Sequence, residues 1–168
     1  MKRHSFTLLE LLVSIGIILV LAAITFGGMN YASKRAQEAK TIATMEEFIN
    51  ALESFKQDYG FYPIIDKDKA VKIDLSADGW KLFMNEKSGV TNKKKRAYME
   101  GELGPLVDAY GQQFWYQYPG KKNTSKYDLW SMGPDKQHGD KKGNTDDADK
   151  VEHAGDNESD DICSWKQR

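Results

Sequence analysis

The residues best suited to chemistry in this 168-residue sequence are the carboxylates near its carboxyl terminus. Hard oxygen donors in a glycine-containing loop suit Ca²⁺, which takes about 6 to 8 oxygen ligands and tolerates irregular geometry. The same composition is typical of a disordered acidic linker, and composition alone favours the linker. The carboxylates are Asp135, Asp140, Asp146, Asp147, Asp149, Glu152, Asp156, Glu158, Asp160 and Asp161.

The sequence contains no recognisable catalytic set. A catalytic site needs a nucleophile with a base, or two carboxylates on rigid elements at a defined spacing. His4, His138 and His153 have no Ser or Cys partner at such a spacing. There is no zinc-binding His-Glu-x-x-His motif or cysteine cluster, and the lone Cys163 is expected to be a buried or capping residue. A membrane-anchored enzyme therefore lacks a candidate site, and we predict that the protein is not an enzyme.

The amino terminus combines an apolar run of membrane-spanning length with one carboxylate. Residues 11–33 carry no charged side chain and exceed the about 20 residues that a helix needs to cross a bilayer. A signal peptide has a shorter apolar region, of about 7 to 15 residues. Lys2 and Arg3 precede the run, which predicts a cytoplasmic amino terminus and an exported remainder. Glu10 lies at its leading edge, where a carboxylate needs either a positive partner or access to the interface.

An amphipathic pattern follows the apolar run without a break. Apolar residues recur at spacings of three and four, which predicts a helix with one apolar face. The connecting residues 31–41 contain helix formers and no proline. We therefore predict one helix from about Thr7 to about Asp58, whose second half packs against a domain. The apolar positions of that half are Ile42, Met45, Phe48, Ile49, Leu52, Phe55 and Tyr59.

The remaining sequence predicts a small antiparallel sheet. Aromatic residues are dense in residues 112–119 and 126–132, and the turn-forming residues between them predict two antiparallel strands. Their aromatic faces are expected to cover the amphipathic half of the helix. The basic run 92–96 lacks interleaved aromatic residues and is expected to be a solvated loop. The net charge of −1 gives no reason to expect nucleic acid as a partner.

Several motifs resemble those of type IV pilins and pseudopilins. The segment SFTLLELLVSIGIILVLAAI resembles their amino-terminal signature, in which a basic leader is cut before a Phe and a Glu stands fifth in the mature chain. DYGFYP resembles their D-N-G-x-Y-P helix end, where Gly60 can take the left-handed conformation and Pro63 prevents continuation. DAYGQQFWYQYPG and LWSMGPDKQHG resemble D-P-W-G-x-x-Y-x-Y and F-S-x-G-P-D-G-x-x-G. These last two motifs are specific to the major pseudopilin of the type II secretion system.

The resemblance implies a processed amino terminus that takes part in assembly. Prepilin peptidase would cut between Ser5 and Phe6, where most of the family has Gly in place of Ser5, and Phe6 would become N-methylated. Glu10 would then pair with the amine of Phe6, either in its own chain or in a neighbouring subunit.

The resemblance also implies a type IV pilin-like α+β fold, with a long amino-terminal helix packed on a small antiparallel sheet and a calcium-binding carboxyl-terminal loop. The implied segments are a leader (1–5), a transmembrane and assembly helix (6–33) and a periplasmic domain (34–168). Within that domain lie the helix continuation to about 59, a variable segment (64–107), the sheet (112–133) and an acidic loop (134–168).

Calcium ligands are implied by the same resemblance. Major pseudopilins bind calcium through the Asp of G-P-D, a later Asp pair that precedes Ile and Trp, and main-chain carbonyls. The family has only a few residues between the two halves of this site, whereas twenty-four separate them here, so residues 140–157 would loop out. Asp146 and Asp147 remain an alternative closing pair. The implied ligands are Asp135, Asp160 and Asp161, with main-chain carbonyls near Met132 and Gln137.

The function implied is that of a structural subunit of the type II secretion pseudopilus. Such a subunit polymerises through its amino-terminal helix into a helical homo-oligomer, which drives export of folded proteins across the outer membrane. Its implied partners are minor pseudopilins, the inner-membrane assembly platform, prepilin peptidase and membrane lipid. The alternative is a type IV pilin or competence pseudopilin serving adhesion, motility or DNA uptake, which would normally have a carboxyl-terminal cysteine pair.

Overall fold

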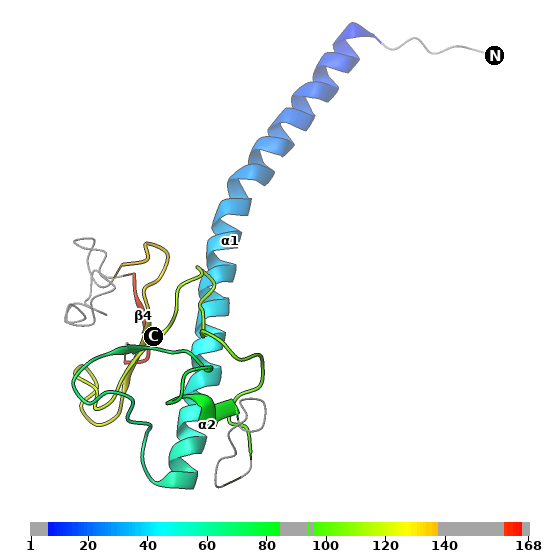
Figure 1. Cartoon of the computed structure of the whole chain (residues 1–168). Helices are drawn as coiled ribbons and strands as arrows, with labels where there is room; N and C mark the ends of the chain where they lie inside the picture. Colours follow the sequence, from blue (N-terminus) through cyan, green and yellow to red (C-terminus); the bar gives the residue numbers. More distant parts are fainter. Residues whose placement is uncertain (1–6, 85–93, 95, 138–159, 166–168) are drawn as a thin grey trace. The chain divides into compact units, whose positions relative to one another are not determined.

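The computed structural model describes residues 7–84, 94, 96–137 and 160–165. The chain divides into two compact units, residues 1–37 and 38–168. One long helix and a small antiparallel sheet confirm the predicted α+β, pilin-like fold. The elements in chain order are α1 (Leu8–Tyr59), β1 (Val71–Lys72), α2 (Lys81–Met84), β2 (Trp115–Gln117), β3 (Asp128–Ser131) and β4 (Ile162–Cys163) (Figure 1).

In the first unit, α1 begins at Leu8 and presents an uncovered apolar surface. The N–H of Glu10 donates to Thr7 Oγ1 at 3.3 Å, so Thr7 caps the helix, and Glu10 stands three residues later, where a capping-box sequence has Glu or Gln. Among the described residues, α1 is the helix long and apolar enough to cross a membrane, and none of its most apolar stretch is buried. Its exposed large apolar residues here are Leu8, Leu9, Leu11, Leu12, Val13, Ile15, Ile17, Ile18, Leu19, Val20, Leu21, Ile24, Met29 and Tyr31.

In the second unit, the predicted apolar face of α1 forms one wall of the core. Met45, Phe48, Leu52 and Phe55 are buried, and the three other predicted positions are partly buried against the same cluster. The helix ends as predicted, because Gly60 takes a φ of +82° and its N–H donates to the carbonyl of residue 56 at 2.7 Å. Only a residue without a Cβ adopts that backbone without strain.

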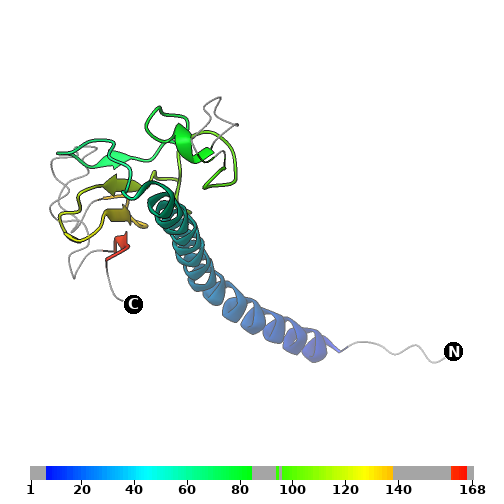
Figure 2. The ribbon, with the colours of Figure 1, turned by 90° about the horizontal axis from the view of Figure 1, so that it is seen from below.

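The sheet has four antiparallel strands in the order β1-β2-β3-β4. Figure 2, viewed from below, shows strands side by side along one flank of the second-unit part of α1. The two predicted strands are confirmed as β2 and β3, with Trp115 opposite Trp130. The two outer strands come from the variable segment and the acidic loop. Each has only two residues, too few for an alternating pattern to indicate a strand.

The two faces of the sheet bury different aromatic groups. Phe114, Tyr116 and Tyr127 join the core against α1, as predicted. Trp115 and Trp130 lie on the opposite face, with ring centroids 6.1 Å apart, and belong to a second cluster. The prediction that the aromatic faces cover the helix is therefore correct for one face only, because successive side chains of a strand point to opposite sides. The second cluster also contains Ala70, Met132, the buried Cys163 and, partly buried, Trp165.

The turn between β2 and β3 is closed by a buried carboxylate. Asp128 accepts main-chain N–H groups from Lys121, Lys122 and Asn123, each at 2.7 Å. These bonds satisfy three donors that the turn would otherwise leave unpaired.

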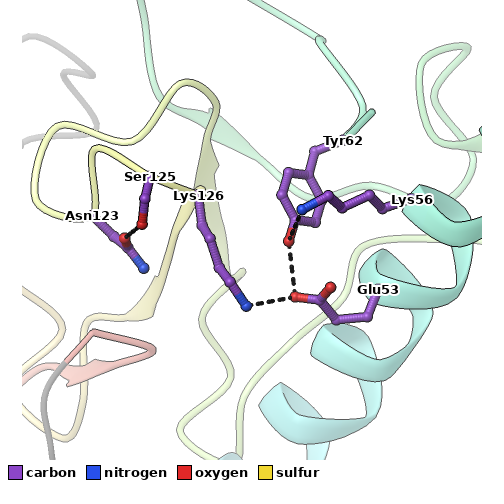
Figure 3. A network of polar contacts seen from close by, with 6 residues as sticks. All are labelled: Glu53, Lys56, Tyr62, Asn123, Ser125 and Lys126. Carbon is purple, nitrogen blue, oxygen red and sulfur yellow. Dashed lines mark hydrogen bonds and ion pairs between the residues drawn. The ribbon is translucent and has the colours of Figure 1, made fainter. Parts of the chain in front are cut away.

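A polar network fastens the same hairpin to α1 (Figure 3). The hydroxyl of Tyr62 donates to Glu53 Oε1 at 2.9 Å, and Lys126 Nζ donates to the same oxygen at 3.0 Å. Lys56 Nζ donates to the Tyr62 hydroxyl and lies over its ring. Burial and the Glu53 carboxylate raise the pKa of Tyr62 to about 12. The phenol therefore stays protonated and acts as a hydrogen-bond donor at neutral pH.

Candidate metal loop and assembly helix

The sheet brings together carboxylates that lie far apart in the sequence. β4 pairs antiparallel with β3, and Ser131 lies opposite Ile162. The residues that follow β3 therefore meet the residues that precede β4 at the same end of the sheet. Asp135 and Asp160 become neighbours in this way, although twenty-four residues separate them.

Main-chain hydrogen bonds shape the loop around these carboxylates. The N–H of Asp135 donates to Asp160 Oδ2 at 3.3 Å, and the N–H of Gln137 donates to Asp135 Oδ1 at 2.9 Å. The intervening Lys136 has a φ of 61°, which makes room for this tight turn. Asp135 Oδ2 is buried and has no hydrogen-bond partner among the residues that the structure describes. A buried carboxylate oxygen in that state is a site for a cation or a donor.

Gly133 allows the two segments of the loop, residues 132–137 and residues 160–161, to approach closely. Gly133 has a φ of +67°, and a Cβ at this position would lie 2.5 Å from the carbonyl oxygen of Asp160. Any larger residue would push the two segments apart. The Gly of the G-P-D motif therefore sets the spacing between residues 132–137 and 160–161.

The neighbouring carboxylates of Asp135 and Asp160 repel one another. Partial burial and the nearby Asp135 carboxylate raise the pKa of the Asp160 carboxyl, because both factors disfavour a second negative charge. Burial also raises the pKa of Tyr110, with further contributions from Glu38, Asp108 and Asp160. The loop and its surroundings therefore carry an excess of negative charge that a bound cation would relieve.

The other predicted ligands lie partly within the described structure. Asp161 and Met132 are buried beside the loop, and Gln137 is half-buried. Within the described ranges, no three His, Cys, Asp or Glu side chains are grouped so that they could hold a metal ion by themselves. Main-chain oxygens would have to complete the site, as the sequence resemblance implied. The alternative pair, Asp146 and Asp147, lies outside the described residues.

At the other end of the chain, Glu10 is exposed in the first turn of α1. Ser5 and Phe6, the predicted cleavage residues, lie outside the described part of the structure. In the first turn of α1, the negative charge of Glu10 interacts favourably with the positive end of the helix dipole. This stabilisation of the helix start does not test the predicted pairing of Glu10 with the Phe6 amine, which stays a prediction.

Sequence reasoning missed two polar residues, Asp108 and Ser131, that lie next to the loop formed by residues 132–137 and 160–161. Asp108 is 6 % exposed and accepts N–H groups from Tyr110 and Gln112, each at 2.8 Å. Its other oxygen accepts the hydroxyl of Ser131 at 2.6 Å. The signal was an Asp that begins a Gly-containing turn, since Asp commonly hydrogen-bonds the main chain two residues on.

Comparison with known proteins identifies the family. Residues 29–150 match the family model "Type II secretion system (T2SS), protein G", and residues 1–26 match the "Prokaryotic N-terminal methylation motif". The chain belongs to the type II secretion system protein G family. It is a structural pseudopilus subunit of type II secretion, as the sequence motifs predicted, rather than a type IV pilin or competence pseudopilin. The methylation motif covers the predicted cleavage position and Glu10.

Proteins named type II secretion system core protein G are similar along most of their length. The Vibrio cholerae protein is 27 % identical over 140 residues, which is 82 % of this chain and 85 % of that protein. The Escherichia coli (strain K12) protein is 28 % identical over 139 residues, or 82 % of this chain and 86 % of that protein. The Aeromonas hydrophila protein is 26 % identical over 140 residues, with 82 % and 87 % covered. An apolar amino-terminal helix in this family suits membrane anchoring.

Proposed function

We propose that this pseudopilin polymerises through the first-unit part of α1 into a helical filament that drives export of folded proteins across the outer membrane. The observation that carries the proposal is the uncovered apolar surface of that helix within a member of this family. Such a surface needs either lipid or other protein around it. Lipid of the inner membrane would cover it before assembly, and the same helices of other subunits would cover it in the filament.

Membrane topology follows from the charges that flank the apolar run. Lys2 and Arg3 would keep the amino terminus in the cytoplasm, which places residues 34–168 in the periplasm. Prepilin peptidase would remove residues 1–5 and leave an N-methylated Phe6. Minor pseudopilins and the inner-membrane assembly platform would be the remaining partners. We propose that the protein's role is structural throughout, with no catalytic step of its own.

Glu10 would mark the register between neighbouring subunits. A carboxylate on a lipid-facing helix costs about 2.5 to 3.5 kcal/mol at the bilayer centre and less near its edge. Processing at Ser5 would create a positive amine on Phe6. Pairing Glu10 with the Phe6 amine of a neighbouring subunit would offset this cost, and it would be available only at the correct stagger between helices.

Three variants separate this assembly role from the helix cap. Glu10→Gln keeps the size of the side chain and a residue type suited to the third helical position but removes the charge, whereas Glu10→Ala removes both. Thr7→Val removes the capping oxygen and keeps the charge, so it is the matched control. We expect electron microscopy of cells that express the whole secretion system to show filaments for the parent and Thr7→Val only. Circular dichroism of the detergent-solubilised chains should show all of them folded. If the Glu10→Gln variant formed as many filaments as the parent, the proposed role of Glu10 in setting the register between subunits would be contradicted.

We also propose that calcium binds the loop described above. Asp135, Asp160 and Asp161 would hold it, together with main-chain carbonyls near Met132 and Gln137. Two observations support this proposal: Asp135 Oδ2 is buried without a hydrogen-bond partner in the described ranges, and neighbouring carboxylates repel one another. Bound calcium would neutralise these charges and join the segment after β3 to the segment before β4.

Thermal unfolding of the full-length chain in detergent tests the calcium site. A ligand at 100 times its Kd stabilises the folded state by about 2.7 kcal/mol, so the parent should melt at a higher temperature in calcium than in a chelator. Asp135→Ala should lose most of that difference, and Asp78→Ala, an exposed carboxylate remote in the sequence, should keep it. The same melting temperature for the parent in calcium and chelator would refute the site.

A further inference from the structure

Behind the metal loop lies a buried polar chain that reaches α1. The hydroxyl of Ser131, a fully buried residue, donates to Asp108 Oδ2 at 2.6 Å and accepts the N–H of Gly133 at 3.1 Å. On the other side, the N–H of Ala109 donates to Oγ1 of the buried Thr41 on α1 at 3.1 Å. Asp108 and its neighbour thus contact both the helix and the start of the loop.

Asp108 fixes the direction in which the Ser131 hydroxyl points. A serine hydroxyl has one proton and two lone pairs. Because the Ser131 hydroxyl donates its one hydrogen bond to the Asp108 carboxylate, a lone pair of Ser131 Oγ is left facing the N–H of Gly133. The two oxygens of Asp108 accept on both sides, from the main-chain N–H groups of Tyr110 and Gln112 and from Ser131. An amide at this position has a single oxygen and could accept on one side only. The carboxylate therefore satisfies the turn and orients Ser131 at the same time.

Gly133 in turn determines where the two segments of the loop meet. Its Cα lies so close to the main chain of Asp160 that a Cβ would collide with the Asp160 carbonyl. A shift of Gly133 would therefore change the separation between Asp135 and Asp160. Calcium ligands are held in place by residues that hydrogen-bond around them, and these supporting residues strongly affect metal affinity.

We propose that Asp108 is a positioning residue for the calcium loop, which it presets through Ser131 and Gly133. The inference rests on the proposed calcium site. Asp108 contributes no ligand. It lowers the reorganisation that the loop needs in order to bind calcium.

Calcium affinity of the full-length chain in detergent micelles tests this role. Asp108→Asn keeps the size of the side chain but places an amide beside Ser131, and Ser131→Ala removes the link directly. Calcium chloride titrations followed by calorimetry should show about 10- to 100-fold weaker binding for each variant. The double variant should bind calcium about as tightly as the single variant that binds it less well, because both substitutions break the same chain of contacts.

Asp128→Asn is the matched control. Asp128 is also a buried carboxylate that accepts main-chain N–H groups, but its bonds close the β2–β3 turn. We expect this variant to melt at a lower temperature in chelator while it binds calcium with parental affinity.

The possible failures are distinguishable. If Asp108→Asn and Ser131→Ala melt earlier in chelator but keep parental calcium affinity, Asp108 has only a structural role and the inference is overturned. If Asp108→Asn does not fold, Ser131→Ala alone decides between these outcomes. A parent chain that binds no calcium overturns the calcium site, and this inference falls with it.

Discussion

Truncation of Phe48 should remove a large part of the stability of the domain. Phe48 is fully buried, with ring centroids 5.5 Å from Trp80 and 5.8 Å from Phe83. Replacing a buried Phe by Ala costs about 3 to 5 kcal/mol through lost transfer energy and the cavity left behind. Domains have about 5 to 15 kcal/mol in total. The substitution should therefore remove at least about a fifth of this stability, and most of it if the domain is marginally stable.

Phe61→Ala provides a matched control with the same chemical change. Phe61 is 50 % exposed and lies at the edge of the aromatic cluster, 6.1 Å from Phe55 between ring centroids. Full burial of such a side chain is worth about 1.5 to 3 kcal/mol, so half-burial predicts a loss of about 1 kcal/mol. The two variants should differ by a factor of about three or more.

Scanning calorimetry of the full-length chain in detergent measures the difference. For a unit of residues 38–168, each kcal/mol lowers the melting temperature by roughly 3 to 5 °C. We expect a loss of about 10 to 25 °C for Phe48→Ala and about 3 to 5 °C for Phe61→Ala. Equal shifts for the two variants would show that the aromatic cluster does not hold the sheet on α1.

Two further substitutions probe the loop and the polar network. Gly133→Ala should lower stability in chelator by about 1 to 3 kcal/mol, because the residue has a positive φ and its new Cβ meets the Asp160 carbonyl; unchanged urea unfolding would contradict this. Burial by itself raises the pKa of Glu53. The hydrogen bonds from Lys126 and Tyr62 and the nearby lysine charges together outweigh burial, so the pKa lies below its ordinary value of 4.5. Ionised Glu53 therefore stabilises the fold above that pH, and the contribution is lost as pH falls through the folded-state pKa. Glu53→Gln should lower the free energy of unfolding at about pH 7 by no more than about 1 kcal/mol for this partly exposed pair, and the loss should shrink as the pH falls below 4.5; a loss that stays the same at every pH would contradict the assignment.

Much of the fold could be predicted from the sequence because its main element is set locally. Hydrophobic spacing of three and four residues indicated the buried face of α1, and Gly60 with Pro63 indicated its end. Two aromatic segments around a turn indicated β2 and β3. Each of these signals lies within about twenty residues of chain, within the reach of periodicity and turn chemistry.

The candidate calcium loop depends partly on long-range contacts. The resemblance pointed to Asp135 and Asp160 as neighbours, yet nothing local to either residue brings them together. Pairing of β4 with β3 does so, and β4 is only two residues long. Its place in the sheet is held by Ile162 and Cys163, which are buried in the two aromatic clusters.

The long helix, its apolar and amphipathic halves, the hairpin and the family of this pseudopilin can all be recognised in the amino-acid sequence. The folded structure was needed to show which strands flank the hairpin and which aromatic face covers α1. It was also needed to show that Asp108 contacts the candidate calcium loop through Ser131. The physical reason is that helix and hairpin patterns repeat along the chain. Contacts between distant segments instead depend on which side chains find a partner when they are buried.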